Sequence, residues 1–203
     1  MIELSKLRLH KSQKFPAFIA LISLLGLMAS IALSSEKTHL LKNPQAELFC
    51  DLNPIYSCKS VILSAQASIF GFSNELIGIA FFGGVLALAI GLLAGAKYKA
   101  WLHKLVWLGL LGSMMMVVWF FYQSVYVIGA LCIYCSSVWF VTWLLFIRYS
   151  HWLLVQKLIK TPKKLAPVFN YFIKYPITIW LIGVLLFICL ALNHFWYYYG
   201  SKF

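Results

Sequence analysis

Five long apolar segments constrain this chain more than any other feature. They occupy residues 17–33, 76–93, 105–122, about 128–147 and about 177–192. Each is close to the ~20 residues that a helix needs to cross ~30 Å of hydrocarbon, and a helix satisfies its own backbone hydrogen bonds, as the bilayer core requires. We therefore predict an all-α, polytopic membrane protein with a four-helix transmembrane bundle plus a fifth transmembrane helix.

Composition supports this class. The 203 residues are 63% hydrophobic and only 11% charged, whereas soluble domains carry roughly 25% charged residues. We expect residues 1–203 to form a single membrane domain in contact with lipid. Within it, we expect an outer loop at 34–73, the remainder of the bundle at 74–147 and the additional helix at 176–193. The first apolar run resembles that of a signal peptide, but residues 29–32 make a poor cleavage site, so an uncleaved helix is predicted.

The net charge of +12 could indicate nucleic-acid binding, but the basic residues fall in the gaps between apolar runs. With the N-terminus in the cytoplasm, thirteen of them lie inside and four outside, as the positive-inside rule predicts. The inside residues are Lys6, Arg8, Lys11, Lys14, Lys97, Lys99, Lys104, Arg148, Lys157, Lys160, Lys163, Lys164 and Lys174. The outside residues are Lys37, Lys42, Lys59 and Lys202. We therefore expect a cytoplasmic N-terminus and no nucleic-acid partner.

The only long outer loop spans 34–73, and its second half is patterned. Residues 60–70 alternate apolar and small polar side chains in a partial helical stripe. This pattern predicts a short amphipathic helix lying at the membrane interface.

Four of the five cysteines fall on the predicted outer face. Cys50 and Cys58 lie in the long loop, and Cys132 and Cys135 form a Cys-x-x-Cys sequence at the outer end of the fourth helix. On the oxidising side of a membrane they are typical of two disulfide-capable pairs. Cys189 stands alone in the last helix and is interpreted as a small apolar packing residue.

The position of the second pair favours reactivity. Residues 132–147 make ~24 Å of helix at ~1.5 Å per residue, so Cys132 and Cys135 lie just inside the outer boundary, within the first turn. Residues three apart share a helix face. Unpaired amide groups and the positive end of the dipole at a helix start favour the thiolate, which is the reactive form.

Other interpretations of these residues stay open. Two cysteine pairs could bind zinc, as in a metal-binding membrane sensor, although the oxidising side disfavours this and we expect no metal site. Cys50–Cys58 could be an inert structural disulfide. A scaffold or transporter with structural disulfides is a further alternative, but transport predicts charged residues inside the spans, and 76–93, 105–122 and 132–147 contain no Asp, Glu, Lys, Arg or His.

The order of the motifs over about 49–143 resembles the vitamin K epoxide reductase family, in its bacterial quinone-coupled branch. The residues that carry the resemblance are Cys50-(seven residues)-Cys58-Lys59-Ser60, Ile69-Phe70-Gly71-Phe72-Ser73-Asn74 and Cys132-Ile133-Tyr134-Cys135. The DsbB type of disulfide-generating membrane protein carries its Cys-x-x-Cys in the first outer loop instead, so the order here favours the epoxide-reductase-like family.

The resemblance implies a four-helix bundle around a quinone, which would be ubiquinone or menaquinone, and a redox-active role for both pairs. Cys50 would face a thiol partner, Cys58 would exchange with Cys132, and Cys135 would face the quinone. Ser73 and Asn74 would lie near the quinone, with Asn74 as a hydrogen-bond donor to a carbonyl group. A helix N-cap for the second span is the alternative role of Ser73 and Asn74.

The implied function is that of a disulfide-generating, membrane thiol:quinone oxidoreductase that reoxidises a thioredoxin-like (DsbA-like) protein for disulfide bond formation. The implied location is the bacterial inner membrane, with the active site on the periplasmic side. Many relatives carry a fused thioredoxin-like domain. No segment here is long enough to form one, so we expect a separate periplasmic thioredoxin-fold partner. A quinone or epoxide reductase with another thiol donor is the alternative function. Trp139 stands where relatives that act on vitamin K often have a tyrosine, so no quinone contact is carried over to it.

Overall fold

Five long helices dominate the structure. The computed structural model describes residues 2–159, 171 and 174–196. The long helices are α1 (Ile2–Lys42), α3 (Glu75–Leu93), α4 (Ala100–Tyr122), α5 (Ile133–Val155) and α7 (Pro176–His194). Each contains a stretch long and apolar enough to cross a membrane, and within the described residues no β-strand forms. The prediction of an all-α, multi-pass membrane protein is confirmed.

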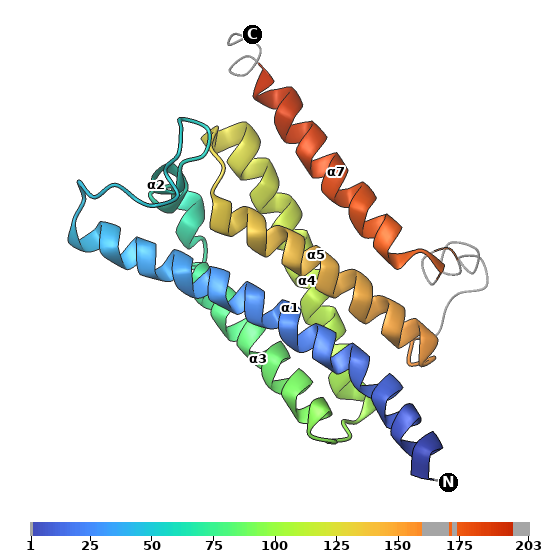
Figure 1. The fold of residues 1–203 in the computed structure, drawn as a ribbon. Helices are drawn as coiled ribbons and strands as arrows, with labels where there is room; N and C mark the ends of the chain where they lie inside the picture. Colours follow the sequence, from blue (N-terminus) through green and yellow to red (C-terminus); the bar gives the residue numbers. More distant parts are fainter. Residues whose placement is uncertain (1, 160–170, 172–173, 197–203) are drawn as a thin grey trace.

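The first four long helices form a bundle, and the fifth lies beside it. Helix α1 packs along α3 and α5, while α5 also contacts α4 and α7 (Figure 1). At the end of the bundle away from the cysteines, the buried His103 of α4 and Tyr149 of α5 share a hydrogen bond of 2.8 Å. This contact satisfies two polar groups that would otherwise be buried without a partner.

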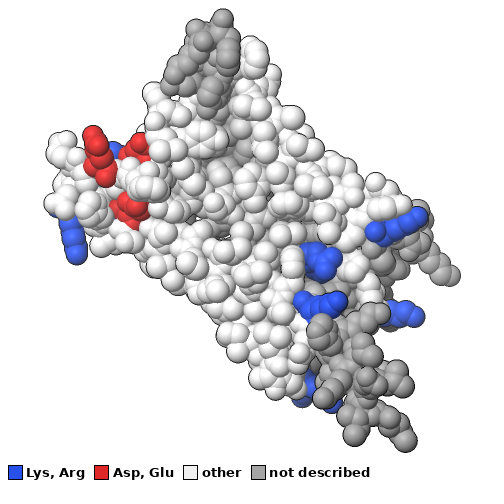
Figure 2. All heavy atoms as spheres, viewed as in Figure 1, with Lys and Arg blue, Asp and Glu red and all other residues white. Residues whose placement is uncertain are grey.

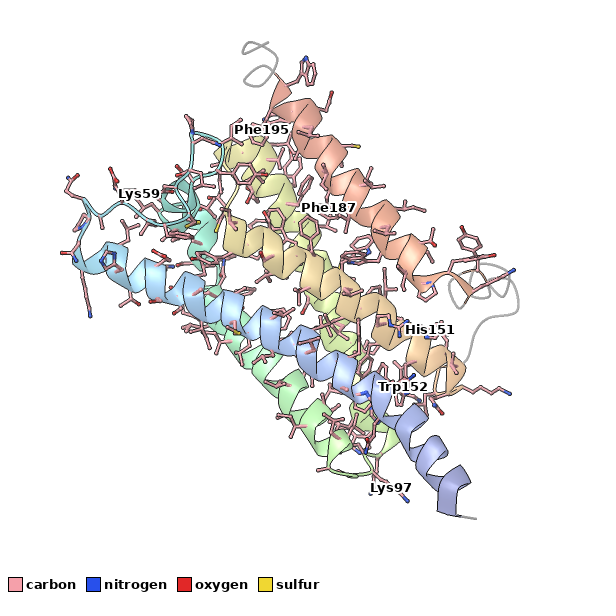
Figure 3. The ribbon with its side chains drawn as sticks, viewed as in Figure 1. Lys59, Lys97, His151, Trp152, Phe187 and Phe195 are labelled. Carbon is pink, nitrogen blue, oxygen red and sulfur yellow. A yellow bond between two sulfur atoms is a disulfide. The ribbon has the colours of Figure 1, made fainter. Side chains whose placement is uncertain are left out.

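Helix α7 contacts the bundle along one face. Gly183 lies against the Trp143 ring, where an added Cβ would collide with the indole. Phe187 packs edge-on against Phe121 and Trp143, and Phe195 is buried in an apolar cluster at the outer end. Phe187 and Phe195 therefore turn from α7 toward the bundle (Figure 3), which fixes the additional helix to the four-helix core.

Several helices end away from the limits of their apolar runs. The apolar run of the first helix ends at Leu33, but helix α1 continues to Lys42, because the polar residues after Leu33 still favour a helix and the first breaker after them is Asn43-Pro44. The first residues of the predicted outer loop, 34–42, are therefore helical. Helix α4 continues into a π-helical turn, η2 (Gln123–Ile128), so the expected loop at 123–127 is helical.

Helix α5 starts later than its apolar run. Gly129 adopts a left-handed φ of 71° after η2, a conformation that favours glycine and ends a helix. Residues 130–132 are then non-helical, and α5 begins at Ile133, with Cys132 at its N-cap. The start predicted near residue 128 is therefore wrong by five residues.

The helix expected at 60–70 is also corrected. It forms two shorter pieces, α2 (Cys58–Ile62) and the 3-10 helix η1 (Ala65–Ser68). Between them, the Ser64 hydroxyl donates to the Val61 carbonyl at 2.7 Å. A short polar side chain that bonds to the local backbone competes with helix continuation, which explains the break.

Charge is divided between the two ends of the molecule. Figure 2 shows acidic residues at the end that carries the cysteine loop and most of the visible Lys and Arg at the opposite end. Of the basic residues used to predict topology, Lys160, Lys163, Lys164 and Lys202 lie outside the described residues.

Candidate active site

The segment that carries Cys50 and Cys58 has a defined backbone. The Asn53 Oδ1 atom accepts hydrogen bonds from the backbone N–H groups of Ile55 and Tyr56, at 2.9 and 2.8 Å. The Asp51 Oδ1 atom accepts one from the Lys59 N–H at 3.1 Å. Asparagine and aspartate commonly fix turns in this way.

A short parallel bridge joins this segment to the chain that leads into α5. Tyr56 pairs with Leu131; the Ser57 N–H donates to the Leu131 carbonyl at 3.0 Å, and the Leu131 N–H donates to the Ile55 carbonyl at 2.6 Å. Cys132 directly follows Leu131, and Cys58 lies two residues after Tyr56. Two segments more than seventy residues apart in sequence thereby bring two cysteines together.

The four outer cysteines form one continuous group. Cys50 and Cys58 are joined in a disulfide with a Cα–Cα distance of 5.7 Å. The Cys58 Sγ lies 3.1 Å from the Cys132 Sγ, and Cys132 and Cys135 are both free thiols. The loop pair is therefore oxidised and the helix pair reduced, with one sulfur of each pair in contact.

Burial separates this group from solvent. The residues Cys50, Cys58 and Cys132 are only 1%, 0% and 0% exposed. They pack in an apolar cluster with Leu40, Leu48 and Ile62. An external thiol can reach these sulfurs only after the loop moves.

The environment of Cys132 favours its thiolate. A side-chain hydrogen bond with Cys135 lowers the pKa of the Cys132 thiol, and burial, which raises this pKa, is the smaller effect. Cys132 is also the N-cap residue of α5, where the helix dipole favours negative charge. Cys132 therefore combines contact with Cys58 and a lowered pKa, the two properties that a sulfur needs for disulfide exchange.

Cys135 faces a cavity of about 400 Å³ between the helices of the bundle. Of the four cysteines, it is the one that lines this cavity. The walls are mainly apolar and include Phe81, Phe82, Met116, Val117, Phe120, Val138 and Trp139. Residues of α2 and η1, namely Val61, Ile62, Gln66 and Ala67, cover its outer side. Ligand pockets are typically concave, mostly apolar and roughly 300–1,000 Å³ in volume.

Asn74 lines the cavity, but its side chain is engaged with the neighbouring backbone. Its Nδ2 donates to the Gln66 carbonyl at 2.6 Å, and its Oδ1 accepts from the Ile69 N–H at 3.3 Å. Asn74 is the N-cap residue of α3, but its side chain makes no capping bond. The side chain instead bonds to the backbone of η1 and of the residue after it. Ser73 is not among the residues that line the cavity; its carbonyl accepts from the Leu76 N–H at 3.1 Å.

Sequence reasoning missed several polar residues of this cavity. Lys37 and Glu75 form an ion pair on its wall at 3.8 Å, and Gln66 donates to Gln123 at 3.3 Å. In the sequence, Lys37 counts only as a charge of the outer loop, and Glu75 is not singled out. The position of Glu75 directly after Ser73-Asn74 is the one sequence signal that could have singled it out.

Within the described part of the chain, no three His, Cys, Asp or Glu side chains are grouped so that they could hold a metal ion. The paired arrangement of sulfurs instead fits disulfide chemistry, with a Cα–Cα distance inside the range of about 4.4–6.8 Å that disulfides require.

The sequence of this chain matches the profile of a known protein family. The profile of the Vitamin K epoxide reductase family matches residues 17–150. This range contains Cys50, Cys58, Cys132 and Cys135 and most of the four-helix bundle, and it ends before α7. A search of curated proteins gives no match. Since the family profile covers more than half of the 203 residues, the chain belongs to the vitamin K epoxide reductase family.

Proposed function

We propose that this protein is a membrane thiol:quinone oxidoreductase that reoxidises a separate, thioredoxin-fold protein and passes the electrons to a quinone. The single observation that carries the proposal is the 3.1 Å contact between the Cys58 and Cys132 sulfurs. It links a disulfide in the outer loop to a dithiol whose second member, Cys135, lines a cavity. The order is that of a relay from the loop to the cavity.

The first step takes place at the loop. A thiolate of the reduced partner attacks the Cys50 sulfur, the Cys50–Cys58 bond breaks, and Cys58 leaves as a thiolate. Since Cys50 is buried, the segment that covers it moves aside first. The second thiol of the partner then attacks the mixed disulfide, so that the partner leaves oxidised and Cys50 is released as a thiolate.

The second step transfers the electrons inward. The Cys58 thiolate attacks Cys132 in an oxidised Cys132–Cys135 pair, and Cys135 leaves with the electron pair. Cys50 then attacks Cys58, which restores the loop disulfide and releases Cys132 as a thiolate. The state with an oxidised loop pair and a reduced helix pair corresponds to the end of this step, and the lowered pKa of Cys132 supports it as the leaving group.

The third step takes place at the cavity. The volume of about 400 Å³ and the apolar walls fit the ring of a quinone. A bound ubiquinone or menaquinone supplies the capacity to accept two electrons and two protons. Cys132 and Cys135 provide the electrons and close the disulfide between them. Ser73 and Asn74 stay candidates for the quinone end of the site, and Asn74 is the better supported because it lines the cavity.

Orientation and location complete the proposal. Basic residues are more frequent in the segments at the end of the bundle away from the cysteine loop, and this excess supports a cytoplasmic N-terminus. The cysteine loop is then on the periplasmic side of a bacterial inner membrane, where a DsbA-like partner would act in disulfide bond formation. Helix α1, the segment 34–73 and the remainder of the bundle at 74–147 would make up the catalytic unit, with the helix at 176–193 added to it.

The alternative is a quinone or epoxide reductase with another thiol donor, which uses the same two cysteine pairs. A purely structural role for Cys50–Cys58 is disfavoured because a structural disulfide has no need of a third sulfur at 3.1 Å.

The test is an assay with the purified protein in detergent or nanodiscs. A reduced thioredoxin-fold protein and a soluble quinone are mixed with it, and quinone absorbance is followed for the wild type and for each Cys→Ala variant. We expect loss of turnover for Cys50, Cys58, Cys132 and Cys135, and normal turnover for Cys189→Ala. Normal turnover of Cys135→Ala would discard the assigned order of electron flow.

A further inference from the structure

A buried ion pair lies on the wall of the cavity at its outer end. Lys37 of α1 and Glu75 of α3 are 3.8 Å apart, and their side chains are only 12% and 6% exposed. Lys37 also donates to the Ser68 hydroxyl of η1 at 3.2 Å. Of the described residues that line this cavity, Lys37 and Glu75 alone carry a formal charge.

Helix packing does not explain this pair. Helices α1 and α3 already approach closely along their length, and a Cβ added to Gly78 would lie 2.6 Å from the Ser30 Oγ. Desolvation of two charges largely offsets their attraction, so a buried pair contributes little stability compared with apolar residues of the same size. Ionisable groups retained in an apolar, membrane-embedded site are more often functional.

The position of Glu75 suits a group that moves protons. It shares the cavity with Cys135, the thiol assigned to the quinone end of the relay. It is the first residue of α3, and Lys37 of α1 pairs with its carboxylate at 3.8 Å, which fixes the carboxylate at the cavity wall. Of the described residues that line the cavity, Glu75 is the one acidic side chain that could relay protons within it.

We propose that Glu75 is the proton carrier of the Cys132–Cys135 pair, and that Lys37 is a positioning residue that holds the Glu75 carboxylate at the cavity wall. The inference rests on the proposed function and adds to it the path of the protons. When Cys58 attacks Cys132, Cys135 leaves as a thiolate. The Glu75 carboxylate takes a proton from water at the outer face and passes it to this thiolate, so that Glu75 ends as a carboxylate again.

The same group acts when the pair is reoxidised. Cys135 returns its proton to the Glu75 carboxylate, which delivers it to a carbonyl oxygen of the acceptor. Cys132 enters this step as a thiolate, so the second proton comes from water through Glu75. Two sulfurs lose two electrons and form one S–S bond, the acceptor gains two electrons and two protons, and Glu75 ends unchanged.

The experiment uses the full-length protein in nanodiscs and two readouts. The first needs no quinone: the protein is oxidised at both cysteine pairs, a pulse of dithiothreitol then reduces the loop pair, and stopped-flow ultraviolet absorbance follows the decay of the Cys135 thiolate. The second is a single turnover with a soluble quinone. Glu75→Gln removes the ionisable group at nearly constant shape, whereas Glu75→Asp keeps a carboxyl group. Glu47→Gln neutralises an exposed acid of the same face and is the matched control.

Proton transfer by a positioned side chain contributes roughly 10²–10⁴-fold. We therefore expect Glu75→Gln to slow thiolate decay and quinone reduction by about a hundredfold. Glu75→Asp should retain most of both rates and Glu47→Gln all of them. The double variant Lys37→Met/Glu75→Leu restores apolar packing between the helices and should stay slow in both readouts.

Wild-type rates in Glu75→Gln, or recovery of those rates in the double variant, would overturn the inference and leave the pair a structural contact. A wild-type protein that reduces no quinone would instead contradict the proposed function, while the quinone-free readout would still report on Glu75. Melting temperatures of all variants are measured alongside, and slow rates count for the inference only in variants that melt like the wild type.

Discussion

The Sγ atoms of Cys58 and Cys132 lie 3.1 Å apart, although Cys58 is already bonded to Cys50. The Cys58 sulfur therefore has two cysteine sulfurs close to it, that of Cys50, to which it is bonded, and that of Cys132. Replacing Cys50 and Cys135 by alanine leaves Cys58 and Cys132 as the sole outer cysteines. We expect most molecules of this double variant to form a Cys58–Cys132 disulfide under mild oxidation, as measured by peptide mass spectrometry without reduction.

A matched variant tests whether this contact is selective. Cys50→Ala/Cys132→Ala leaves Cys58 with Cys135, which lies within the helix and faces the cavity. It should form little cross-link under the same conditions. Equal cross-linking of Cys58 to Cys132 and to Cys135 would show that the bridge between Tyr56 and Leu131 does not determine which of the two cysteines reacts with Cys58.

The ionisation of Cys132 gives a pH prediction. Its pKa is lowered, first of all by the side-chain hydrogen bond with Cys135, so the thiolate persists below the ordinary pKa of a thiol and is lost as the pH falls through the lowered value. In Cys135→Ala the hydrogen bond is absent and the opposing effect of burial stays. The ultraviolet thiolate titration of Cys132 should therefore shift to higher pH. The Cys132→Ala variant identifies the band, and an unshifted curve would contradict the assigned cause.

The loop conformation can be tested at Asn53. Its Oδ1 atom accepts two backbone hydrogen bonds, from Ile55 and Tyr56. Each such bond contributes about 0.5–1.5 kcal/mol, so Asn53→Ala should destabilise the closed loop by roughly 1–3 kcal/mol. We expect slower exchange between Cys58 and the Cys132–Cys135 pair, measured by quenching and mass spectrometry. Asn53→Asp keeps the acceptor oxygen and should be close to wild type; equal losses in both variants would exclude the turn as the cause.

The cavity can be tested at Gly112. This residue of α4 lines the cavity, and a Cβ built on it meets nothing within 4 Å. Gly112→Ala should be tolerated, whereas Gly112→Phe places a ring inside the space of about 400 Å³. We expect the latter to raise the KM for quinone by about tenfold or more, equivalent to about 1.4 kcal/mol, with unchanged reduction of Cys50–Cys58 by a dithiol.

Gly84 provides the control for that substitution. It is an exposed residue of α3 where an added Cβ also meets nothing within 4 Å, and it does not line the cavity. Gly84→Phe should leave the KM for quinone unchanged. An equal rise in both phenylalanine variants would indicate a general effect on the bundle rather than occupation of the cavity.

Much of the architecture could be predicted from residue types alone. A helix that crosses lipid needs a continuous apolar run, and all five runs became helices. Their ends could not be predicted as well, because polar residues such as Glu36 and Lys37 continue α1 beyond its apolar part. The π-helical turn at η2 and the left-handed Gly129 likewise depend on how α4 meets the loop, which a single segment does not encode.

The candidate site, like the fold, could be predicted only in part. The two cysteine pairs are visible as spacings in the sequence, and the approach of Cys58 to Cys132 followed from the family resemblance. The pairing of Lys37 with Glu75 was not predicted, since it joins α1 to α3 at the cavity wall. Contacts between distant helices depend on their relative rotation, and nothing local in either segment specifies that rotation.

The burial of the loop disulfide has a consequence for selectivity. Both of its sulfurs lie beneath the surface, so a reductant in solution reacts with them slowly until the covering segment moves aside. Of two reductants with the same potential, the one that displaces this segment is oxidised faster, and access rather than potential then decides which thiols the protein oxidises.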